Sequence, residues 1–219
     1  MRDLVIIGAG GFAREVAWLV EEINQEKNSW NLVGFIDEDQ EKQGQVLNGY
    51  SVLGSFAALE KLPLSTLAIC ALGNPGDKQR LVEKAKVPGR KFATLIHPGI
   101  SLSSTVIAGE GVIISKGCIL TTNISIGDHV GINPGCGIGH DTVLKSYCTL
   151  MWHVNIAGKA VVGEGCALGT KTTVLQGISI GEWSAIGAGA VVTKDIPAHC
   201  TAVGMPAKPI KFHDREVGF

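Results

Sequence analysis

Residues 126–144 read IGDHVGINPGCGIGHDTVL and carry an aliphatic side chain at every sixth position. The step continues to residue 192, so that Ile, Leu or Val occupies twelve consecutive positions: Ile126, Ile132, Ile138, Leu144, Leu150, Ile156, Val162, Leu168, Val174, Ile180, Ile186 and Val192. In an α-helix each step of six would rotate the side chain by about 240° and scatter these residues over three sides. In strands they all share one side, because side chains alternate with a period of two. The pattern therefore predicts short stacked strands.

Each unit of six also has a second inward position and a corner. The residue two places before the aliphatic is mostly small, and a glycine often follows the aliphatic. Ile107, Ile113 and Ile119 keep the step of six ahead of the main run, with one extra residue between Ile119 and Ile126. This is the signature of a hexapeptide β-helix, in which a repeat buries its aliphatic only by stacking on its neighbours.

The six cysteines fit the repeat better than a disulfide or metal framework. Cys136, Cys148 and Cys166 occupy the small inward position, and no C-x-x-C motif occurs. Free cysteine is commonly buried as a small hydrophobic residue. We expect reduced cysteines that line the interior, a cytoplasmic protein and no bound metal.

Charge density divides the chain near residue 95. Residues 1–95 carry 23 charged side chains, and residues 96–195 carry 11. The first part has strand-like runs at 4–7, 32–36 and 67–72, and helical patterns at 12–23 and 77–86. Strand, glycine turn and helix in this order indicate a small parallel sheet. We expect an α/β half-Rossmann domain over 1–95 and a parallel β-helix with a C-terminal exit segment over 96–219.

Composition excludes several classes of partner. Nineteen basic and twenty acidic residues give a net charge of -1. This balance argues against nucleic acid and against an anionic membrane surface, because both select basic proteins. A hydrophobic content of 45% is enough to bury a core, which excludes intrinsic disorder.

Segments from both parts of the chain resemble one family. The hexads that begin at Ile126, Ile180 and Ile186 are similar to those of left-handed β-helix acyltransferases, and VGMPAK at 203–208 resembles their exit segment. IIGAGGFAREV at 6–16, FID at 35–37 and ALGN at 71–74 resemble the sialic-acid O-acetyltransferase family. That family includes the N-acetyltransferases of nucleotide-linked amino-deoxysugars of the bacillosamine and perosamine kind.

The resemblance implies both a fold and a reaction. The β-helix would be left-handed with three hexads per coil, and the protein a homotrimer with active sites between subunits. Acetyl-CoA would be the co-substrate, bound between neighbouring subunits, while the first domain presents a nucleotide sugar. The acceptor would be an amino or hydroxyl group of a sugar. The resemblance favours a nucleotide-linked 4-amino-4,6-dideoxysugar of bacterial glycan biosynthesis. A sialic-acid-type O-acetyltransferase is the alternative, because the residues do not decide between amine and hydroxyl.

Acetyl transfer from a thioester needs a general base, and histidine is the usual one near neutral pH. From the residues alone His140 and His153 are equal candidates, since His129 falls at an outward corner position where a solvated side chain is expected. The resemblance selects His140, which together with Asp141 matches the family's pair of histidine and acid. In that family the histidine deprotonates the acceptor and the acid raises its basicity, as expected of a negative charge beside an imidazole.

The resemblance also implies further site residues in the repeat domain. Asn133 matches an asparagine that lines the same pocket, although a turn residue before Pro134 is an equal explanation. Gly158 matches the position whose backbone N–H faces the thioester carbonyl, with an ordinary corner glycine as the alternative. Thr149 and Thr170 match coenzyme A contacts, and Thr149 replaces a histidine found in some members.

The glycine-rich turn of the first domain is a phosphate-binding motif. Gly8-x-Gly10-x-x-Ala13 follows a strand, and Asp37 ends the next strand, as in a dinucleotide-binding fingerprint. About ninety residues hold only half of such a fold, and a helix N-terminus binds any phosphate, including that of a nucleotide sugar. By the resemblance, the residues that contact the acceptor are Gly10, Gly11, Phe12, Asp37, Glu38 and Gly73. Phe12 stands where relatives carry a histidine.

Two other classes of function compete with acetyl transfer. The γ-class carbonic anhydrases are β-helix enzymes that hold zinc with three histidines across a subunit boundary. Here His129, His140 and His153 are eleven and thirteen residues apart, which does not fit a repeat of six. A non-catalytic nucleotide-binding scaffold would share the whole pattern, and only a test of His140 distinguishes it.

Overall fold

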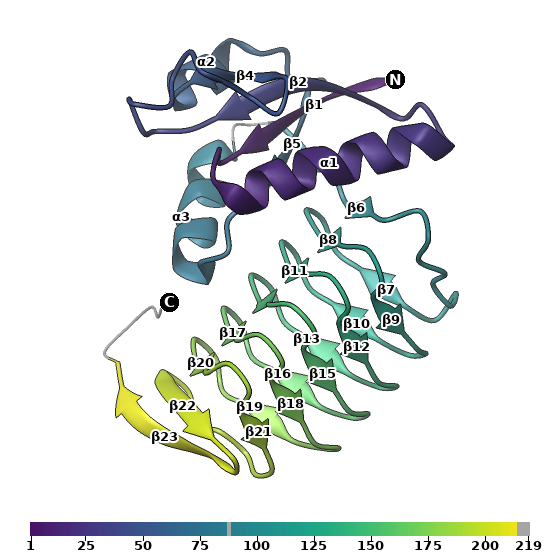
Figure 1. The fold of residues 1–219 in the computed structure, drawn as a ribbon, viewed down its shortest axis with the longest axis vertical. Helices are drawn as coiled ribbons and strands as arrows, with labels where there is room; N and C mark the ends of the chain where they lie inside the picture. The colour runs from purple at the N-terminus through teal and green to yellow at the C-terminus, as the bar shows by residue number, and fades with distance from the viewer. Residues whose placement is uncertain (87–88, 214–219) are drawn as a thin grey trace.

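The computed structural model describes residues 1–86 and 89–213 and contains an α/β domain above a three-sided prism of short strands (Figure 1). The helices are α1 (Gly11–Glu26), α2 (Phe56–Lys61) and α3 (Pro75–Ala85). The strands of the first domain are β1 (Arg2–Ile7), β2 (Trp30–Ile36), β3 (Val46–Leu47), β4 (Tyr50–Gly54) and β5 (Leu67–Cys70), in the order β3-β4-β2-β1-β5. Each predicted strand and helix overlaps one of these elements, whereas β3, β4 and α2 were not predicted.

The central strand β1 explains why the first domain has two layers of helix. It pairs in parallel with β2 and β5. Leu4 and Ile6 pack with α1 on one face of the sheet, while Val5 and Ile7 pack with α2 and α3 on the other. A strand buried on both faces reads as a continuous aliphatic run, as this one does. Within the described residues, no helix is both long and apolar enough to cross a membrane.

The prism consists of three parallel faces, which the chain visits in turn. Face 1 contains β7 (Ile107–Ala108), β10 (Ser125–Ile126), β13 (Val143–Leu144), β16 (Val161–Val162) and β19 (Ser179–Ile180). Face 2 contains β6 (Leu95–Ile96), β8 (Ile113–Ile114), β11 (Gly131–Ile132), β14 (Thr149–Leu150), β17 (Ala167–Leu168), β20 (Ala185–Ile186), β22 (Cys200–Gly204) and the antiparallel β23 (Ala207–Phe212). Face 3 contains β9 (Ile119–Leu120), β12 (Gly137–Ile138), β15 (Asn155–Ile156), β18 (Thr173–Val174) and β21 (Val191–Val192).

One coil of the prism takes three hexads. Ile126 pairs with Leu144 on face 1, and Ile138 pairs with Ile156 on face 3, so that stacked residues are eighteen apart. The aliphatic ladder and the small inward residues form one continuous core, in which Cys136, Cys148 and Cys166 are buried as free thiols. The expected β-helix with three hexads per coil and interior cysteines is therefore confirmed.

The predicted phase of the first coil is wrong. Ile107 and Ile119 point outward and are 70% and 69% exposed, because Ile107 pairs with Ser125 and Ala108 pairs with Ile126. The inward step of six runs without interruption through Ala108, Ile114 and Leu120 to Ile126, so no extra residue is inserted. A shift of one residue turns a side chain to the other face of a strand. Ile113 also points outward but is buried, because the first domain covers it.

Many corners of the prism turn on a residue in the left-handed backbone region. Some of these are glycines, and nine are not, with φ between 54° and 63°: Asn123, His129, Asp141, Tyr147, His153, Lys159, Lys171, Trp183 and His199. This conformation costs an L-residue about 1–2 kcal/mol. Stacking of the coils above and below fixes the corner in spite of that cost.

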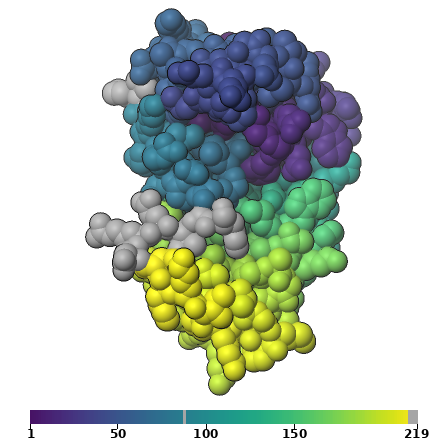
Figure 2. All heavy atoms as spheres, turned by 60° about the vertical axis from the view of Figure 1, so that its left-hand side comes forward, coloured from purple at the N-terminus to yellow at the C-terminus, as the bar shows by residue number. Residues whose placement is uncertain are grey.

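The first domain rests on face 2 of the prism, with α1 above β6, β8 and β11 (Figure 1). Figure 2 shows the two parts in contact with each other. Strand β6 already pairs with β8, so the predicted division between residues 95 and 96 falls inside a strand of the prism. Glu22 of α1 contacts Lys116 and His97 of the prism, at 2.6 Å and 3.4 Å. The side chains of Leu95 and Ile113 belong to the core of the first domain, so the two parts share buried surface.

Candidate active site

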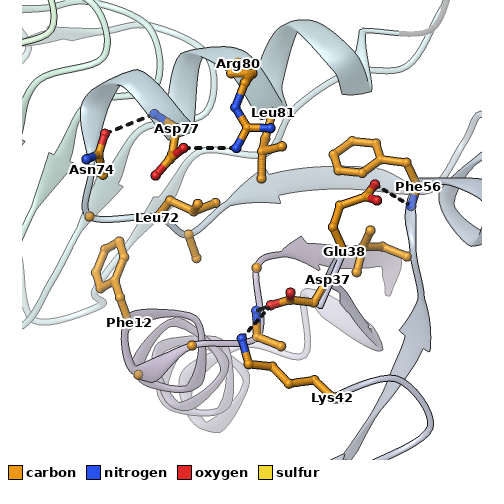
Figure 3. A pocket seen from close by; sticks show the side chains of 17 residues that line it. Phe12, Asp37, Glu38, Lys42, Phe56, Leu72, Asn74, Asp77, Arg80 and Leu81 are labelled. Atoms are coloured by element: carbon orange, nitrogen blue, oxygen red, sulfur yellow. Dashed lines mark hydrogen bonds and ion pairs between the residues drawn. The ribbon is translucent and has the colours of Figure 1, made fainter. Parts of the chain in front are cut away.

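A hollow of about 480 Å³ opens in the first domain where β1, β2 and β5 end (Figure 3). Ligands of open α/β sheets bind at these carboxyl ends. The lining includes all six residues that the resemblance assigned to the acceptor: Gly10, Gly11, Phe12, Asp37, Glu38 and Gly73. The fold thus brings the three separate sequence segments into one pocket.

The N-terminus of α1 opens into this pocket with bare backbone. Gly10 precedes the helix, no side chain caps the first turn, and the first turn carries no acidic residue. A Cβ on Gly10 or Gly11 would meet nothing within 4 Å, so the packing of the chain does not require glycine at either position. Free N–H groups at a helix N-terminus attract an anion, and the missing side chains let it come close.

Asp37 is held rigidly at the end of β2. Its carboxylate accepts hydrogen bonds from the backbone N–H of Ala9 at 2.8 Å and of Asp39 at 2.9 Å, and it pairs with Lys42 at 3.4 Å. An acid in this place binds the ribose hydroxyls in dinucleotide-binding folds. The side chain is therefore oriented before any ligand arrives.

Glu38 lies next to Asp37 and is anchored through one carboxylate oxygen. Its Oε1 accepts from the Lys84 ammonium at 2.7 Å and from the Phe56 backbone N–H at 3.3 Å. The hydrogen bond from Lys84 is the main cause that lowers the pKa of Glu38, so the group is ionised at neutral pH.

Sequence reasoning missed the polar rim of the pocket opposite α1. Asn74 caps α3 by accepting from the Asp77 N–H at 3.0 Å, and Arg80 pairs with Asp77 at 3.0 Å (Figure 3). With Lys42, Arg80 places a second cation at the hollow. Asn74 ends the ALGN motif, but no motif marks Lys42, Asp77 or Arg80, because Lys42 lies in a loop and the other two lie in a charged helix.

The edge of the pocket nearest to face 2 borders the prism. A Cβ on Gly131 of face 2 would lie 3.9 Å from the Phe12 ring, and a Cβ on Gly73 would lie 3.7 Å from the Met151 methyl. Phe12 therefore fills the space between the first domain and the prism. A bound nucleotide sugar would extend toward this junction.

His140 and Asp141 form a hydrogen-bonded pair at the corner between faces 3 and 1. The His140 Nδ1 and Asp141 Oδ2 atoms are 2.7 Å apart, and both side chains are about half exposed. Asn123, one coil earlier, donates a hydrogen bond to the other oxygen of Asp141 at 3.2 Å. The hydrogen bond with His140 is the main cause that lowers the pKa of Asp141, and the bond from Asn123 adds to it. An ionised Asp141 accepts from Nδ1–H, which leaves Nε2 free as a proton acceptor. Sequence reasoning missed Asn123, although its spacing of eighteen residues could have indicated it.

Gly158 lies directly against His140, one coil further along the same corner. A Cβ on Gly158 would lie 2.6 Å from Cε1 and Nε2 of the imidazole. Among the described residues, no acceptor bonds the Gly158 N–H. The base and a free backbone donor thus occupy one corner.

The other predicted residues of the prism lie elsewhere. Asn133 is at the corner between faces 2 and 3, 5% exposed, and its Oδ1 has no hydrogen-bond partner in the described chain. Thr170 lies exposed at the same corner, two coils further along. Thr149 is on face 2 and buried, and its hydroxyl accepts from the Lys78 ammonium at 2.8 Å. One chain therefore does not bring Asn133, Thr149 or Thr170 next to His140.

The expectation of a solvated His129 is wrong. Its ring is 3% exposed and lies edge-on to Phe92 and stacked on Tyr147, with centroids at 4.8 Å and 5.4 Å. The first domain and the segment that leads out of it cover this corner. Burial lowers the pKa of His129 to about 4, because the charged ring loses its water.

The three histidines weighed for zinc occupy three different corners: His129 between faces 1 and 2, His153 between faces 2 and 3, and His140 between faces 3 and 1. They do not converge within one chain. In the described residues, no group of three or more His, Cys, Asp or Glu side chains is arranged to hold a metal ion.

Comparisons with known proteins match this architecture over nearly its full length. Residues 3–85 match the PglD N-terminal domain family. The chain is 31% identical to the GDP-perosamine N-acetyltransferase of Escherichia coli O157:H7 over 212 residues, which cover 94% of this chain and 95% of that protein.

Two solved structures extend the comparison to three dimensions. PerB from Caulobacter crescentus, in complex with CoA and GDP-perosamine, superposes with a TM-score of 0.85 at 31% identity and covers 95% of this chain and 97% of that one. The acetyltransferase domain of PglB from Neisseria gonorrhoeae, in complex with acetyl coenzyme A, has a TM-score of 0.86 at 29% identity, with coverage of 95% and 99%. The class is therefore that of left-handed β-helix acetyltransferases with an α/β domain in front. Within it, the chain belongs to the family of the perosamine N-acetyltransferases and the PglB acetyltransferase domain.

Proposed function

We propose that this protein transfers the acetyl group of acetyl-CoA to the amino group of a nucleotide-linked amino-dideoxysugar. The observation that carries the proposal is the pairing of a helix-terminus pocket with a histidine–carboxylate base on one chain. Relatives that cover almost the same length bind GDP-perosamine and CoA, or acetyl coenzyme A, which supports an amine acceptor and this co-substrate.

The first domain would bind the nucleotide part of the acceptor. The diphosphate would lie at the bare backbone of Gly10 and Gly11, with Lys42 and Arg80 close enough to offset its charge. Asp37, already oriented by Ala9, would accept hydrogen bonds from the ribose hydroxyls. The sugar would then extend past Phe12 toward the prism.

His140 would act as the general base. Its Nε2 takes a proton from the acceptor amine while the nitrogen forms a bond with the thioester carbonyl carbon. The Gly158 N–H is a donor for the carbonyl oxygen as negative charge develops on it. The C–S bond then breaks, the amide forms, and the proton on the imidazole neutralises the departing CoA thiolate. Ionised Asp141 stabilises the imidazolium between these two transfers.

The complete site would need a second copy of the chain. In a three-sided prism the corner that carries His140 lies opposite face 2, on which the first domain rests. The pocket and the base of one chain therefore face away from each other. A homotrimer in which the His140 corner of one subunit meets the pocket of its neighbour would join them, with acetyl-CoA in the boundary.

Within that boundary we include Asn133 and Thr170, which share the corner between faces 2 and 3. The unpartnered Oδ1 of Asn133 can accept a hydrogen bond from the acceptor or from coenzyme A. We leave Thr149 out of the proposed acetyl-CoA contacts, because its hydroxyl is buried and bonded to Lys78.

The test is the release of free CoA from acetyl-CoA, followed with a thiol-reactive dye, across amino sugars linked to GDP, UDP and dTDP. Free and CMP-linked sialic acid represent the hydroxyl acceptors of an O-acetyltransferase. We expect turnover with at least one 4-amino-4,6-dideoxysugar nucleotide and its loss in His140→Ala. Turnover with sialic acid alone would favour the O-acetyltransferase, and no turnover with any acceptor would favour a binding scaffold.

A further inference from the structure

Lys78 of α3 is a charged side chain that is buried completely between the first domain and the prism. It is 1% exposed. Its ammonium donates to the Thr149 hydroxyl at 2.8 Å, to the Cys148 carbonyl at 3.1 Å and to the Tyr147 carbonyl at 3.4 Å. All three acceptors belong to the prism, at the start of β14 and the corner before it.

This arrangement is costly, and its geometry offsets the cost. A buried ammonium loses the favourable free energy of its hydration. Three donors that meet three oxygens recover much of this, although none of the oxygens carries a charge. Burial lowers the pKa of Lys78 to about 8. A plain hydrophobic contact would join the domains without such a charge, but it would fix their relative position less strictly, because it has no preferred direction.

The placement of Lys78 connects the acceptor pocket to the prism. Asn74 and Asp77 before it, and Arg80 and Leu81 after it, line the pocket on one side of α3. The Lys78 ammonium reaches the other way, where a Cβ on Gly131 would lie 3.7 Å from it. One helix thus forms a wall of the pocket and inserts a cation into face 2.

We propose that Lys78 is a positioning residue: by bonding α3 to the 147–149 segment of the prism, it sets where the acceptor pocket stands relative to the corners that carry the chemistry. This inference rests on the proposed function, since it concerns the delivery of the acceptor amine to a base. Lys78 itself lies outside the hollow and contacts no reacting group.

The domains have other contacts that keep a Lys78 variant folded. Tyr147 donates to Glu83 at the far end of α3 at 3.0 Å, and Lys116 pairs with Glu22 of α1 at 2.6 Å. Lys78→Met keeps the length of the side chain and removes its charge and donors. Thr149→Val is a milder change, which removes one acceptor and keeps the shape. Lys61→Met removes an exposed lysine of α2, at the far end of the same domain, and is the matched control.

Steady-state kinetics and calorimetry with GDP-perosamine, or the best acceptor of the panel, separate positioning from the alternatives. In Lys78→Met we expect kcat to fall on the order of 10²-fold, as for a misplaced substrate. The dissociation constant of the acceptor should stay within about threefold of wild type, because the pocket residues are intact. In Thr149→Val kcat should fall less than in Lys78→Met, and in Lys61→Met it should not change. Wild-type kcat in Lys78→Met would overturn the proposal, as would a loss of acceptor affinity equal to the loss of kcat.

Hydrogen exchange tests the same contact without turnover. The amides of α3 and of 147–149 should exchange faster in Lys78→Met than in wild type and Lys61→Met. If the wild type acetylates no acceptor, the proposed function fails, and this measurement still decides whether Lys78 fixes the domains. Unchanged exchange would show that it does not.

Discussion

The imidazole of His140 lies against the α-carbon of Gly158, and no other residue type leaves room for it there. A Cβ at residue 158 would lie 2.6 Å from both Cε1 and Nε2 of the ring, closer than real Cβ atoms come to any neighbour. The position of the base therefore depends on a glycine eighteen residues away, one coil along the corner.

Gly158→Ala should displace the His140 ring. We expect kcat to fall on the order of 10²-fold, while the acceptor dissociation constant is unchanged because the pocket lies in the other domain. Thiol release at varied acceptor concentration measures kcat, and calorimetry measures the acceptor dissociation constant. In a His140→Asn background the same change should have little further effect, since residues that act as one unit are not additive. A full additional loss there would mean that Gly158 acts independently of the ring.

Asp141→Asn should reduce activity less than His140→Ala, for which we expect a loss of about 10²–10⁴-fold in kcat. Asp141 is ionised at neutral pH, because the hydrogen bond from His140 lowers its pKa. Removing this negative charge disfavours the protonated imidazole, so the acid limb of the rate profile should move to lower pH. The pH dependence of kcat/KM in both proteins is the measurement, and identical profiles would contradict the proposed role of Asp141.

His129 should make the fold sensitive to acid. Burial lowers its pKa to about 4, whereas an unfolded histidine titrates near pH 6.5. The unfolded chain therefore binds the proton first, and stability falls as the pH drops from about 6.5 toward 4. At about pH 4.5 His129 should lower the free energy of unfolding by about 2–3 kcal/mol relative to its value at pH 7.

Urea unfolding of wild type and His129→Phe at matched protein concentration checks this value. Phenylalanine keeps an aromatic ring between Phe92 and Tyr147 and cannot be protonated. The variant should lose less stability between pH 7 and pH 4.5. Equal losses in the two proteins would assign the acid sensitivity to other groups.

Two inactive variants should restore activity when they share a trimer. His140→Ala keeps the pocket, and Gly11→Val blocks the pocket but keeps the base. If one subunit supplies each half, random mixing regenerates roughly a quarter of the sites. Light scattering should give three times the chain mass of 23.0 kDa. A mixture that exchanges subunits and stays inactive would show that both halves act within one chain.

The sequence predicted the coil of the prism because a step of six is a local property. The phase of the first coil was not predictable in the same way. Ile107, Ile113 and Ile119 have the correct spacing but point outward, and Ile113 is buried only because the first domain covers it. Spacing shows which residues share a face, whereas the choice between interior and exterior depends on what packs outside.

The same limit applies to the candidate site. The glycine turn and the acids after β2 were found because they lie in short motifs, and the fold places them in one hollow. Lys78 gave no signal, since a lysine in a charged helix reads as solvated. His129 was wrongly expected to be solvated for the same reason, because its corner is exposed in the repeat alone and is buried by a domain distant in sequence.

The left-handed corners of the prism identify positions where a side chain is kept although its backbone conformation lowers the stability of the fold. Glycine would relieve the strain at any of them, yet nine keep another residue. Four have an evident purpose: Asn123 and Asp141 support the base, while His129 and Tyr147 seat the first domain. Three others make contacts within the chain: His199 pairs with Glu182 at 3.6 Å, and the rings of His153 and Trp183 lie against Gly135 and Gly165. By the same logic we expect Lys159 and Lys171, whose side chains form no hydrogen bond or ion pair among the described residues, to be retained for contacts with another chain. Exchange of each of these two lysines for glycine tests this expectation: the variant should resist urea better than wild type as a single chain, but should weaken the proposed assembly.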